Sequence, residues 1–290
     1  MSNGRQAFLL FGCLLIDLLN QPCGEKLLVI RDCFLALGLS VVLMPIANVI
    51  GEERSCAWKQ TATLDAPEAN QAAAADESFV YAINNTMVAK YGRASGELVA
   101  KSEGDAQHLN SGFLHEGKLY CAHSNYPFKP ESSIIKVLDV ASMQLSDFHR
   151  FGHSPHGSLT VAVFKDEAWW CVFAVYGKGD NARTVLVKFD PAWQEQAVWT
   201  FPPSVVSDLG SSSISGGIWL GDEFLATGHD KKVIYRLKLP ETGSVLMHTA
   251  TCLTPFPGQG IAMDPKTGGL VGIHRQKRQV IFAEHASANP

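Results

Sequence analysis

The sequence predicts an all-β body, a five-bladed β-propeller, and three observations carry that prediction. An apolar strand with one basic residue recurs along the chain, and its basic residues Lys90, Lys136, Lys188 and Arg236 lie 46, 52 and 48 residues apart. A strand of small residues and a turn precede each copy. The segment 57–64 alternates like a strand but has no repeat before it. Such periods are typical of repeat proteins, which build a core by packing similar units together.

Each repeat divides into four expected strands. The innermost strand is rich in small residues, as a narrow axis requires, at 70–73, 110–113, 156–159, 215–218 and 258–261. The second strand follows a turn with Gly or an acidic residue, at 79–82, 119–122, 169–172, 224–227 and 270–273. The third strand carries the basic residue, at 87–91, 134–138, 186–190 and 234–237, with a fifth copy at 280–283. The outer strand has four copies, at 98–102, 145–151, 197–201 and 245–253.

The fifth repeat has no outer strand after it. We therefore expect 57–64 to supply that strand and to close the ring, because closure protects the exposed edges of sheets. The predicted organisation is an apolar leader at 1–54, the propeller at 55–286 and a short tail at 287–290. A β-sandwich is the alternative architecture.

The leader predicts export. Residues 33–50 form an uncharged run of eighteen residues behind Lys26 and Arg31. That length is at the threshold for a membrane span, and a basic flank before an apolar run also fits a secretory signal. We expect an apolar helix, either cleaved or kept as an anchor, and a periplasmic or extracellular body that meets the membrane only through this segment. The alternative is a buried helix that packs on the body.

Composition disfavours several classes of function. The chain has 290 residues, 18% of them charged, and a net charge of −4. It has no clustered basic face for nucleic acid. Its seven cysteines show no CxxC or CxxH spacing, which disfavours a structural zinc site. Cys121 and Cys171 lie in apolar strands and are expected to be buried thiols.

Two strand endings carry a family resemblance. The sequences Val-Lys-Phe-Asp-Pro at 187–191 and Ile-Ala-Met-Asp-Pro at 261–265 resemble those of divergent β-propellers, the NHL and YncE-like repeat proteins. The resemblance covers about residues 57–285 and implies the propeller architecture. It implies little about function, because propellers host many activities.

Polar residues are expected to gather on one face of the ring. In a propeller, the start of the innermost strand and the end of the second strand lie on the same face, and six of the ten histidines fall at these positions. The predicted ligand-binding residues are His108, Asn110, His123, Asn125, His153, His156, His229, Asp230, Gln259, His274 and Arg275.

Two functions of different class fit this face. The first is a noncatalytic binding module for a small polar ligand or a protein partner. The second is a metal-assisted hydrolase or lyase in which His156, His229 and His274 hold a divalent ion in the channel, since imidazoles bind metals and titrate near neutral pH. The remaining alternative is that the histidines have no ligand and only fill polar positions of the channel, where they bind water. Other enzyme classes are disfavoured, because the face carries one acid, Asp230, whereas glycosidases need two, and no nucleophile elbow or phosphate-binding motif occurs. Of the two functions that remain, we prefer the binding module.

Overall fold

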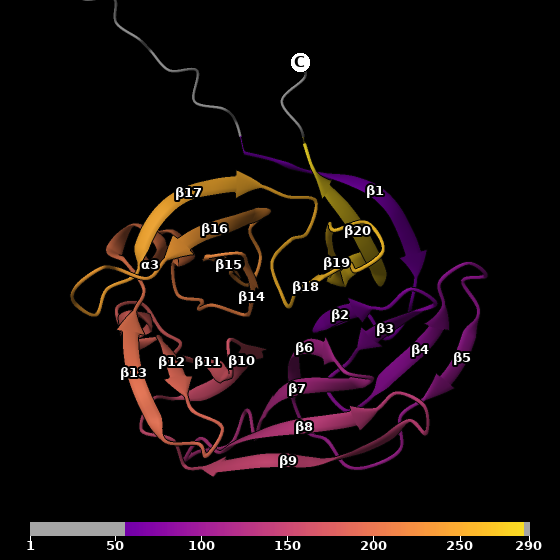
Figure 1. The fold of residues 1–290 in the computed structure, drawn as a ribbon, viewed down its shortest axis with the longest axis horizontal. Helices are drawn as coiled ribbons and strands as arrows, with labels where there is room; N and C mark the ends of the chain where they lie inside the picture. The colour runs from indigo at the N-terminus through magenta and orange to yellow at the C-terminus, as the bar shows by residue number, and fades with distance from the viewer. Residues whose placement is uncertain (1–55, 287–290) are drawn as a thin grey trace, which may run out of the picture. The chain divides into compact units, whose positions relative to one another are not determined.

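The computed structural model describes residues 56–286, which form five four-stranded antiparallel sheets around a central axis (Figure 1). The predicted all-β, five-bladed propeller is therefore confirmed. The predicted leader and tail, with the expected apolar helix, lie outside the described residues. Within residues 56–286, no helix is both long and apolar enough to cross a membrane.

The first four blades each follow the chain from the axis outward. Blade 1 contains β2 (Ala72–Ala75), β3 (Phe79–Ile83), β4 (Val88–Gly92) and β5 (Leu98–Lys101). Blade 2 contains β6 (Leu109–His115), β7 (Lys118–Ser124), β8 (Ser133–Asp139) and β9 (Gln144–Gly152). Blade 3 contains β10 (Ser158–Lys165), β11 (Ala168–Ala174), β12 (Val185–Phe189) and β13 (Glu195–Thr200). Blade 4 contains β14 (Gly216–Leu220), β15 (Glu223–Thr227), β16 (Val233–Lys238) and β17 (Met247–Leu253).

Blade 5 combines strands from both ends of the described chain. Its inner strands are β18 (Ala262–Met263), β19 (Leu270–His274) and β20 (Gln279–His285), and its outermost strand is β1 (Trp58–Asp65). β1 runs antiparallel to β20, with Trp58 opposite His285 and Asp65 opposite Gln279. Figure 1 shows the two strands side by side at the junction of the ring.

A disulfide joins this junction to the neighbouring blade. Cys56, just before β1, is bonded to Cys252 in β17, 196 residues further along the chain. The backbone is also linked there, because Leu253 N donates to Cys56 O at 3.0 Å. The spacing of the cysteines did not predict this pair, since connectivity cannot be read from sequence. Cys121 and Cys171 are buried free thiols, as expected.

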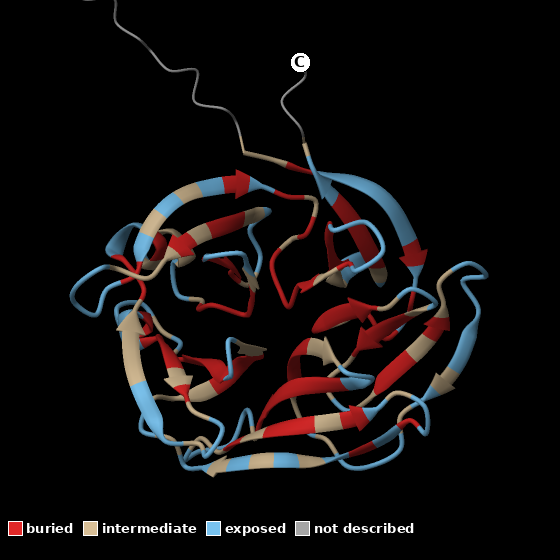
Figure 2. Cartoon of the chain, viewed as in Figure 1, coloured by how far each residue is buried: buried red, intermediate tan, exposed pale blue. Residues whose placement is uncertain are grey.

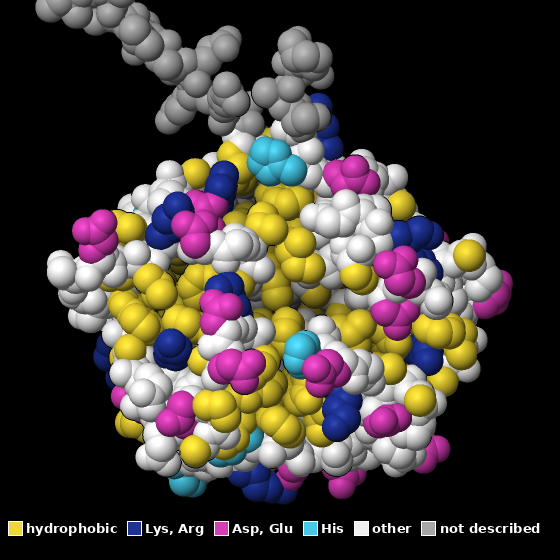
Figure 3. All heavy atoms as spheres, viewed as in Figure 1, with side chains coloured by type: hydrophobic (Ala, Val, Ile, Leu, Met, Phe, Trp, Pro, Cys, Tyr) yellow, Lys and Arg dark blue, Asp and Glu magenta, His cyan; other side chains and the backbone are white. Residues whose placement is uncertain are grey.

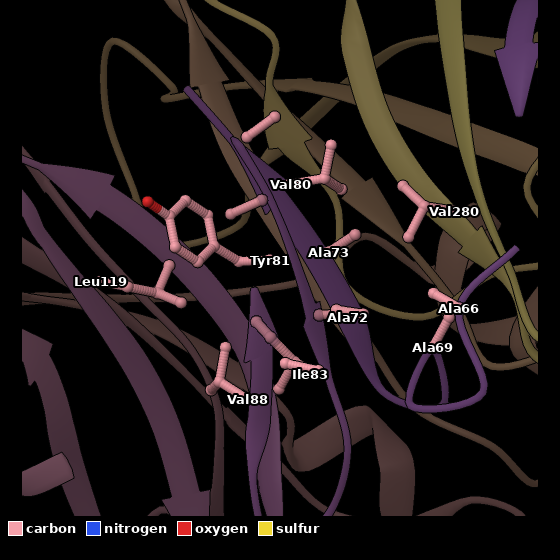
Figure 4. Packing of buried hydrophobic residues seen from close by; sticks show 14 of the residues in the cluster. Ala66, Ala69, Ala72, Ala73, Val80, Tyr81, Ile83, Val88, Leu119 and Val280 are labelled. Carbon is pink, nitrogen blue, oxygen red and sulfur yellow. The ribbon is translucent and has the colours of Figure 1, made fainter. Parts of the chain in front are cut away.

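Small residues let the blades meet near the axis. All four residues of β2 are buried alanines. Figure 4 shows Ala72 and Ala73 between the side chains of the same blade and Val280 of blade 5. A Cβ added to Gly260 would lie 2.5 Å from the Cβ of Ala72, so only glycine fits there. The buried core therefore lies mainly on the inner and middle strands, while the outer strands are largely exposed (Figure 2).

Within residues 56–286, three short helical segments interrupt the strand pattern. They are η1 (Asp180–Arg183), α3 (Pro203–Leu209) and η2 (Arg275–Lys277). α3 connects blades 3 and 4 and buries Val205. Pro203 occupies its first turn, where a missing N–H has no cost. The strand repeat alone did not predict this helix.

Candidate functional site

The central channel opens into a different cavity at each end. In the first four blades the chain crosses the blade four times, in alternating directions, and so returns to the same end of the channel. The inner strands therefore all begin at one end of the channel and finish at the other. The cavity at their starts measures about 360 Å³ and the cavity at their ends about 420 Å³. We call the first the polar mouth; its lining residues are Gln71, His108, Asn110, Ser124, Tyr126, Ser158, Thr160, Tyr176, Ser212, Ser215, His229, Gln259 and Arg275.

The second cavity, which we call the apolar mouth, has a different lining. Hydrophobic side chains such as Phe113, Ile218, Trp219 and Met263 contribute most of its named residues. In the view of Figure 3, hydrophobic side chains gather around the centre of the ring. The full lining is Ala75, Phe113, Leu114, His115, Glu116, Gly117, Val163, Phe164, Lys165, Ile218, Trp219, Ala262, Met263 and Pro265.

All five blades contribute to the polar mouth. Hydroxyl and amide groups come from the starts of the inner strands, and Tyr126 and Tyr176 at its rim remain 59% and 45% exposed. None of the thirteen lining residues is Asp or Glu. The volume lies within the range of about 300–1,000 Å³ that small-molecule sites occupy. This end of the channel is therefore a concave, hydrogen-bonding pocket with one guanidinium.

Arg275 is the centre of the hydrogen-bond network in the polar mouth. Its Nε donates to Asn70 O at 2.7 Å, and its Nη1 donates to His229 Nε2 at 3.2 Å. Its Nη2 donates to Gln71 Oε1 at 3.1 Å and to Gln259 Oε1 at 2.7 Å. Arg275 thereby ties together residues of blades 1, 4 and 5.

Two glutamines are held so that their oxygens face Arg275. Gln259 Nε2 donates to His229 O at 2.8 Å, and Gln71 Nε2 donates to Asn85 Oδ1. An arginine can only donate, so both amides must present their carbonyl oxygens to it. The orientation of the two amides is consequently fixed by their own partners.

The tautomer of His229 follows from the same reasoning. Its Nε2 must accept the hydrogen bond from Arg275 Nη1, so the neutral ring carries its hydrogen on Nδ1. Nδ1 then donates to Asp230 Oδ2 at 2.8 Å. The carboxylate of Asp230 is itself 78% exposed and lies outside the pocket lining.

His108 and Asn110 line the pocket from blade 2. The ring of His108 lies 5.0 Å from that of Tyr126, and Asn110 Nδ2 donates to Leu159 O at 3.0 Å. Burial, and then the charge of Arg275, lower the pKa of His108. The ring is therefore favoured in its neutral form, able to donate one hydrogen bond and accept one.

His123 lies outside the pocket lining and is only 7% exposed. Its Nε2 accepts a hydrogen bond from Gln107 N at 2.9 Å, and its Nδ1 is buried without a partner. Burial, and then the charge of Lys136, lower its pKa to about 4. His123 is thus a neutral, structural histidine rather than a ligand contact.

Four other predicted residues also lie away from the pocket lining. Asn125 holds its own loop, donating to Pro130 O and accepting from Ser132 N. His153 Nδ1 lies 2.9 Å from Glu131 O, and His156 Nε2 lies 2.9 Å from Glu195 Oε2 of β13. His274 ends β19 with its Nδ1 buried and unpartnered. Of the eleven predicted residues, His108, Asn110, His229, Gln259 and Arg275 line the pocket.

The structure does not assemble the expected metal ligands. Across residues 56–286, no three His, Cys, Asp or Glu side chains are grouped so as to hold a metal ion. His156 is bonded to Glu195, while His229 is bonded to Asp230 and to Arg275. The guanidinium beside His229 also repels a cation. The geometry therefore gives no support to a channel ion on His156, His229 and His274.

Sequence reasoning missed the hydroxyls of the pocket. Ser158 and Thr160 stand two residues apart at the start of β10, while Leu159 between them is fully buried. Side chains at i and i+2 share one face of a strand. The alternation of hydroxyl and apolar residues in 158–161 was the signal that could have found them.

Comparisons with known proteins identify the fold. No protein-family model and no curated protein matches the chain. Among solved structures, the crystal structure of Myxococcus xanthus glutaminyl cyclase has a TM-score of 0.55 and 9% identity, covering 81% of this chain and 98% of that one. A structure of the mitotic checkpoint complex gives 0.45 and 11%, covering 85% and 98%. Hydrazine synthase of Kuenenia stuttgartiensis gives 0.42 and 9%, covering 79% and 72%. At such identities the likeness to glutaminyl cyclase shows the propeller fold and nothing about activity.

Proposed function

We propose that this propeller is a binding module that holds a small polar ligand in the polar mouth. The observation that carries the proposal is the lining, to which every blade brings a hydrogen-bonding side chain around one pocket of about 360 Å³. Concave sites with a few convergent polar groups are the usual form of small-molecule sites. The two exposed tyrosines at the rim offer flat surfaces against which a ligand can pack.

The lining favours binding over catalysis. No carboxylate lines the pocket, and no three metal-ligating side chains are grouped among residues 56–286. Of the two lining histidines, His229 Nε2 already accepts a hydrogen bond from Arg275, which leaves only His108 with a free ring lone pair for a general base. Of the two functions that the sequence suggested, the binding module therefore has the stronger support.

We further propose that the body is exported, as the apolar leader suggests. The disulfide between Cys56 and Cys252 supports this location. Such bonds persist in oxidising compartments and are rare in the reducing cytosol. Thiol labelling of protein isolated from its own cells tests this. Labelling of Cys56 and Cys252 without added reductant would contradict an extracytoplasmic body.

A ligand screen tests the binding proposal. Saturation-transfer NMR on the full chain with a library of small polar compounds should identify binders. Their affinity should fall by about 5- to 30-fold in Tyr126→Ala or Tyr176→Ala, because truncating an aromatic contact residue costs about 1–2 kcal/mol.

Phe128→Ala is the matched control for these variants. Phe128 lies in the same loop as Tyr126 and is 64% exposed, but it does not line the pocket. Its truncation should leave binding unchanged. A library without a binder, or binders insensitive to both tyrosines, would contradict the proposed function.

The metal content of the purified protein tests the enzyme alternative. Stoichiometric metal that is lost in His229→Ala and His274→Ala would support a metal-assisted hydrolase or lyase. A metal-free protein whose stability does not change in chelator would contradict the metal-assisted enzyme and favour the binding module.

A further inference from the structure

We propose that the ligand of the polar mouth carries a carboxylate and that Arg275 binds it. The inference rests on the proposed function and names the chemical class of its ligand. Its basis is a partly buried cation whose hydrogen-bond partners within the protein are all neutral.

Arg275 has no ion pair among residues 56–286. Its four hydrogen-bond partners are Asn70 O, the side-chain oxygens of Gln71 and Gln259, and His229 Nε2. Charged groups that leave water are normally matched by an opposite charge. Asp230 is the acid that this network reaches, but its carboxylate accepts a hydrogen bond from His229 Nδ1 rather than from Arg275, and it remains largely exposed.

One donor of the guanidinium is still available. An arginine has five N–H groups. Nε uses one, Nη2 uses two and Nη1 uses one, so the second N–H of Nη1 has no acceptor in the described part of the chain. A carboxylate oxygen placed there would accept a charge-assisted hydrogen bond, which is about twice as strong as a neutral one.

The surroundings of Arg275 favour this charge. Burial lowers the pKa of Arg275, so the cation is poorly hydrated and a bound anion would stabilise it. The lining contains no acid that would repel the ligand, and the hydroxyl of Ser158 can donate to it, whereas those of Thr160 and Ser215 already donate to Val172 O and Ser213 O.

A single negative charge fits better than a phosphate. Arg275 is the one Lys or Arg of the lining, and three carbonyl oxygens already surround it. These oxygens would repel the second charge of a phosphate dianion. A carboxylate carries one charge, which the one cation of the site matches, and the free N–H of Arg275 Nη1 can donate to one of its oxygens.

Two sources can supply the carboxylate: a sugar acid or the C-terminus of a short peptide. Two matched pairs of probes distinguish them. The first pair is D-glucuronate and D-glucose, and the second is N-acetylglycylglycine and its C-terminal amide. In each pair the two compounds differ in the charge of one group.

Isothermal titration calorimetry of the full chain measures all four compounds at low salt. We expect the acid of one pair to bind at least tenfold more tightly than its neutral partner, and that pair identifies the source. Arg275→Gln should remove the preference, and Arg275→Lys should retain part of it. Arg278→Gln, which removes a positive charge three residues away, should retain it fully. Thermal unfolding checks that each variant is folded.

Other outcomes separate the carboxylate from the pocket itself. Equal binding of acid and neutral probes, lost in Tyr176→Ala, would overturn the carboxylate and leave the binding module intact. An acid preference that survives in folded Arg275→Gln would overturn the role of Arg275. If neither acid binds but the NMR screen finds another binder, the inference fails alone. If the screen also finds none, the proposed function fails with it.

Discussion

Two arginines join blade 5 to blade 1, one on each face of the ring, and one has a charged partner while the other has only neutral partners. Arg93, which follows β4, donates from Nη1 and Nη2 to the two carboxylate oxygens of Asp264, both at 2.6 Å. Arg275, which follows β19, contacts only neutral acceptors. The first lies at the end where inner strands finish and the second at the end where they begin.

The difference distinguishes a structural arginine from one suited to a ligand. Asp264 is fully buried, and Arg93 also lies 4.7 Å from the ring of Phe282, so the charge of this arginine is matched within the protein. Desolvation tends to raise the pKa of Asp264, but hydrogen bonds from Arg93, Thr267 and the backbone of Lys266 outweigh it and lower the pKa. Both arginines border a hollow of the surface, but Arg275 has no such carboxylate, so its charge is left without a partner in the described residues.

Breaking the Arg93–Asp264 pair should have the largest effect. Arg93→Gln or Asp264→Asn should lower the free energy of unfolding by about 3–5 kcal/mol, because each removes one member of a buried pair. The double variant should lose less than the sum, since the two residues interact directly. Urea denaturation measures all three.

Asp222→Asn is the control for this effect. Asp222 forms an exposed ion pair with Lys238, and such pairs contribute about 0–1 kcal/mol. Equal losses in Asp222→Asn and Asp264→Asn would contradict the structural role of the Arg93 pair.

Acid should weaken the protein through His123, which belongs to the same blade as His108 and Asn110. The pKa of His123 is about 4 in the folded protein, against an ordinary value of 6.5 for histidine. Between these values the unfolded chain binds more protons, so stability present above pH 6.5 is lost as the pH falls towards 4. From pH 7 to 4.5 this amounts to about 2 kcal/mol.

His123→Gln should flatten that pH dependence, because glutamine keeps an acceptor for Gln107 N and does not titrate. Denaturant midpoints of the two proteins from pH 7 to 4.5 provide the measurement. Parallel curves would show that His123 is not the buried group that titrates.

Arg275→Gln should destabilise the protein less than Arg93→Gln does. The acceptors that Arg275 leaves behind border the pocket, where water can replace it, so we expect a loss of about 1–2 kcal/mol. Urea midpoints of the two variants under one condition test the comparison. A larger loss for Arg275→Gln would make Arg275 mainly a structural residue.

The smallest expected effect is on His108. Burial is the main cause of the lowered pKa of His108, and the positive charge of Arg275 is the second. Arg275→Gln removes this second cause. That pKa should therefore rise, while burial keeps it below its ordinary value. NMR titration of the ring protons measures it, with Arg278→Gln as the control. An unchanged pKa would place the Arg275 charge too far from His108 to matter.

The repeat was predictable because each strand type has its own chemistry. Predicted segments such as 79–82 and 98–102 fall on β3 (Phe79–Ile83) and β5 (Leu98–Lys101). The predicted strand boundaries agree less well with the structure near the axis. In blade 5 the inner strand β18 has only two residues, and they follow the predicted segment 258–261. α3 and the disulfide lie between blades, where the repeat carries no information.

The site was predictable only in part. The position of a residue in the repeat indicates on which face of the ring it lies, but not whether its side chain points into the channel. Gln259 and Arg275 were placed correctly at the channel. His153 and His156 occupy the same stretch before β10, yet they contact Glu131 and Glu195 instead. Gly152 and Gly157 flank this loop with φ of 64° and 108°, conformations that turn the chain and that the strand pattern does not encode.

The disulfide determines how the body bears mechanical load. A pull on the chain at Cys56 passes through a covalent bond into Cys252 of blade 4, in parallel with β1. Without that bond the tension would act on the end of β1 alone and could peel it from β20 one hydrogen bond at a time. Reduction of this bond should therefore make the N-terminal edge of the ring easier to detach under tension.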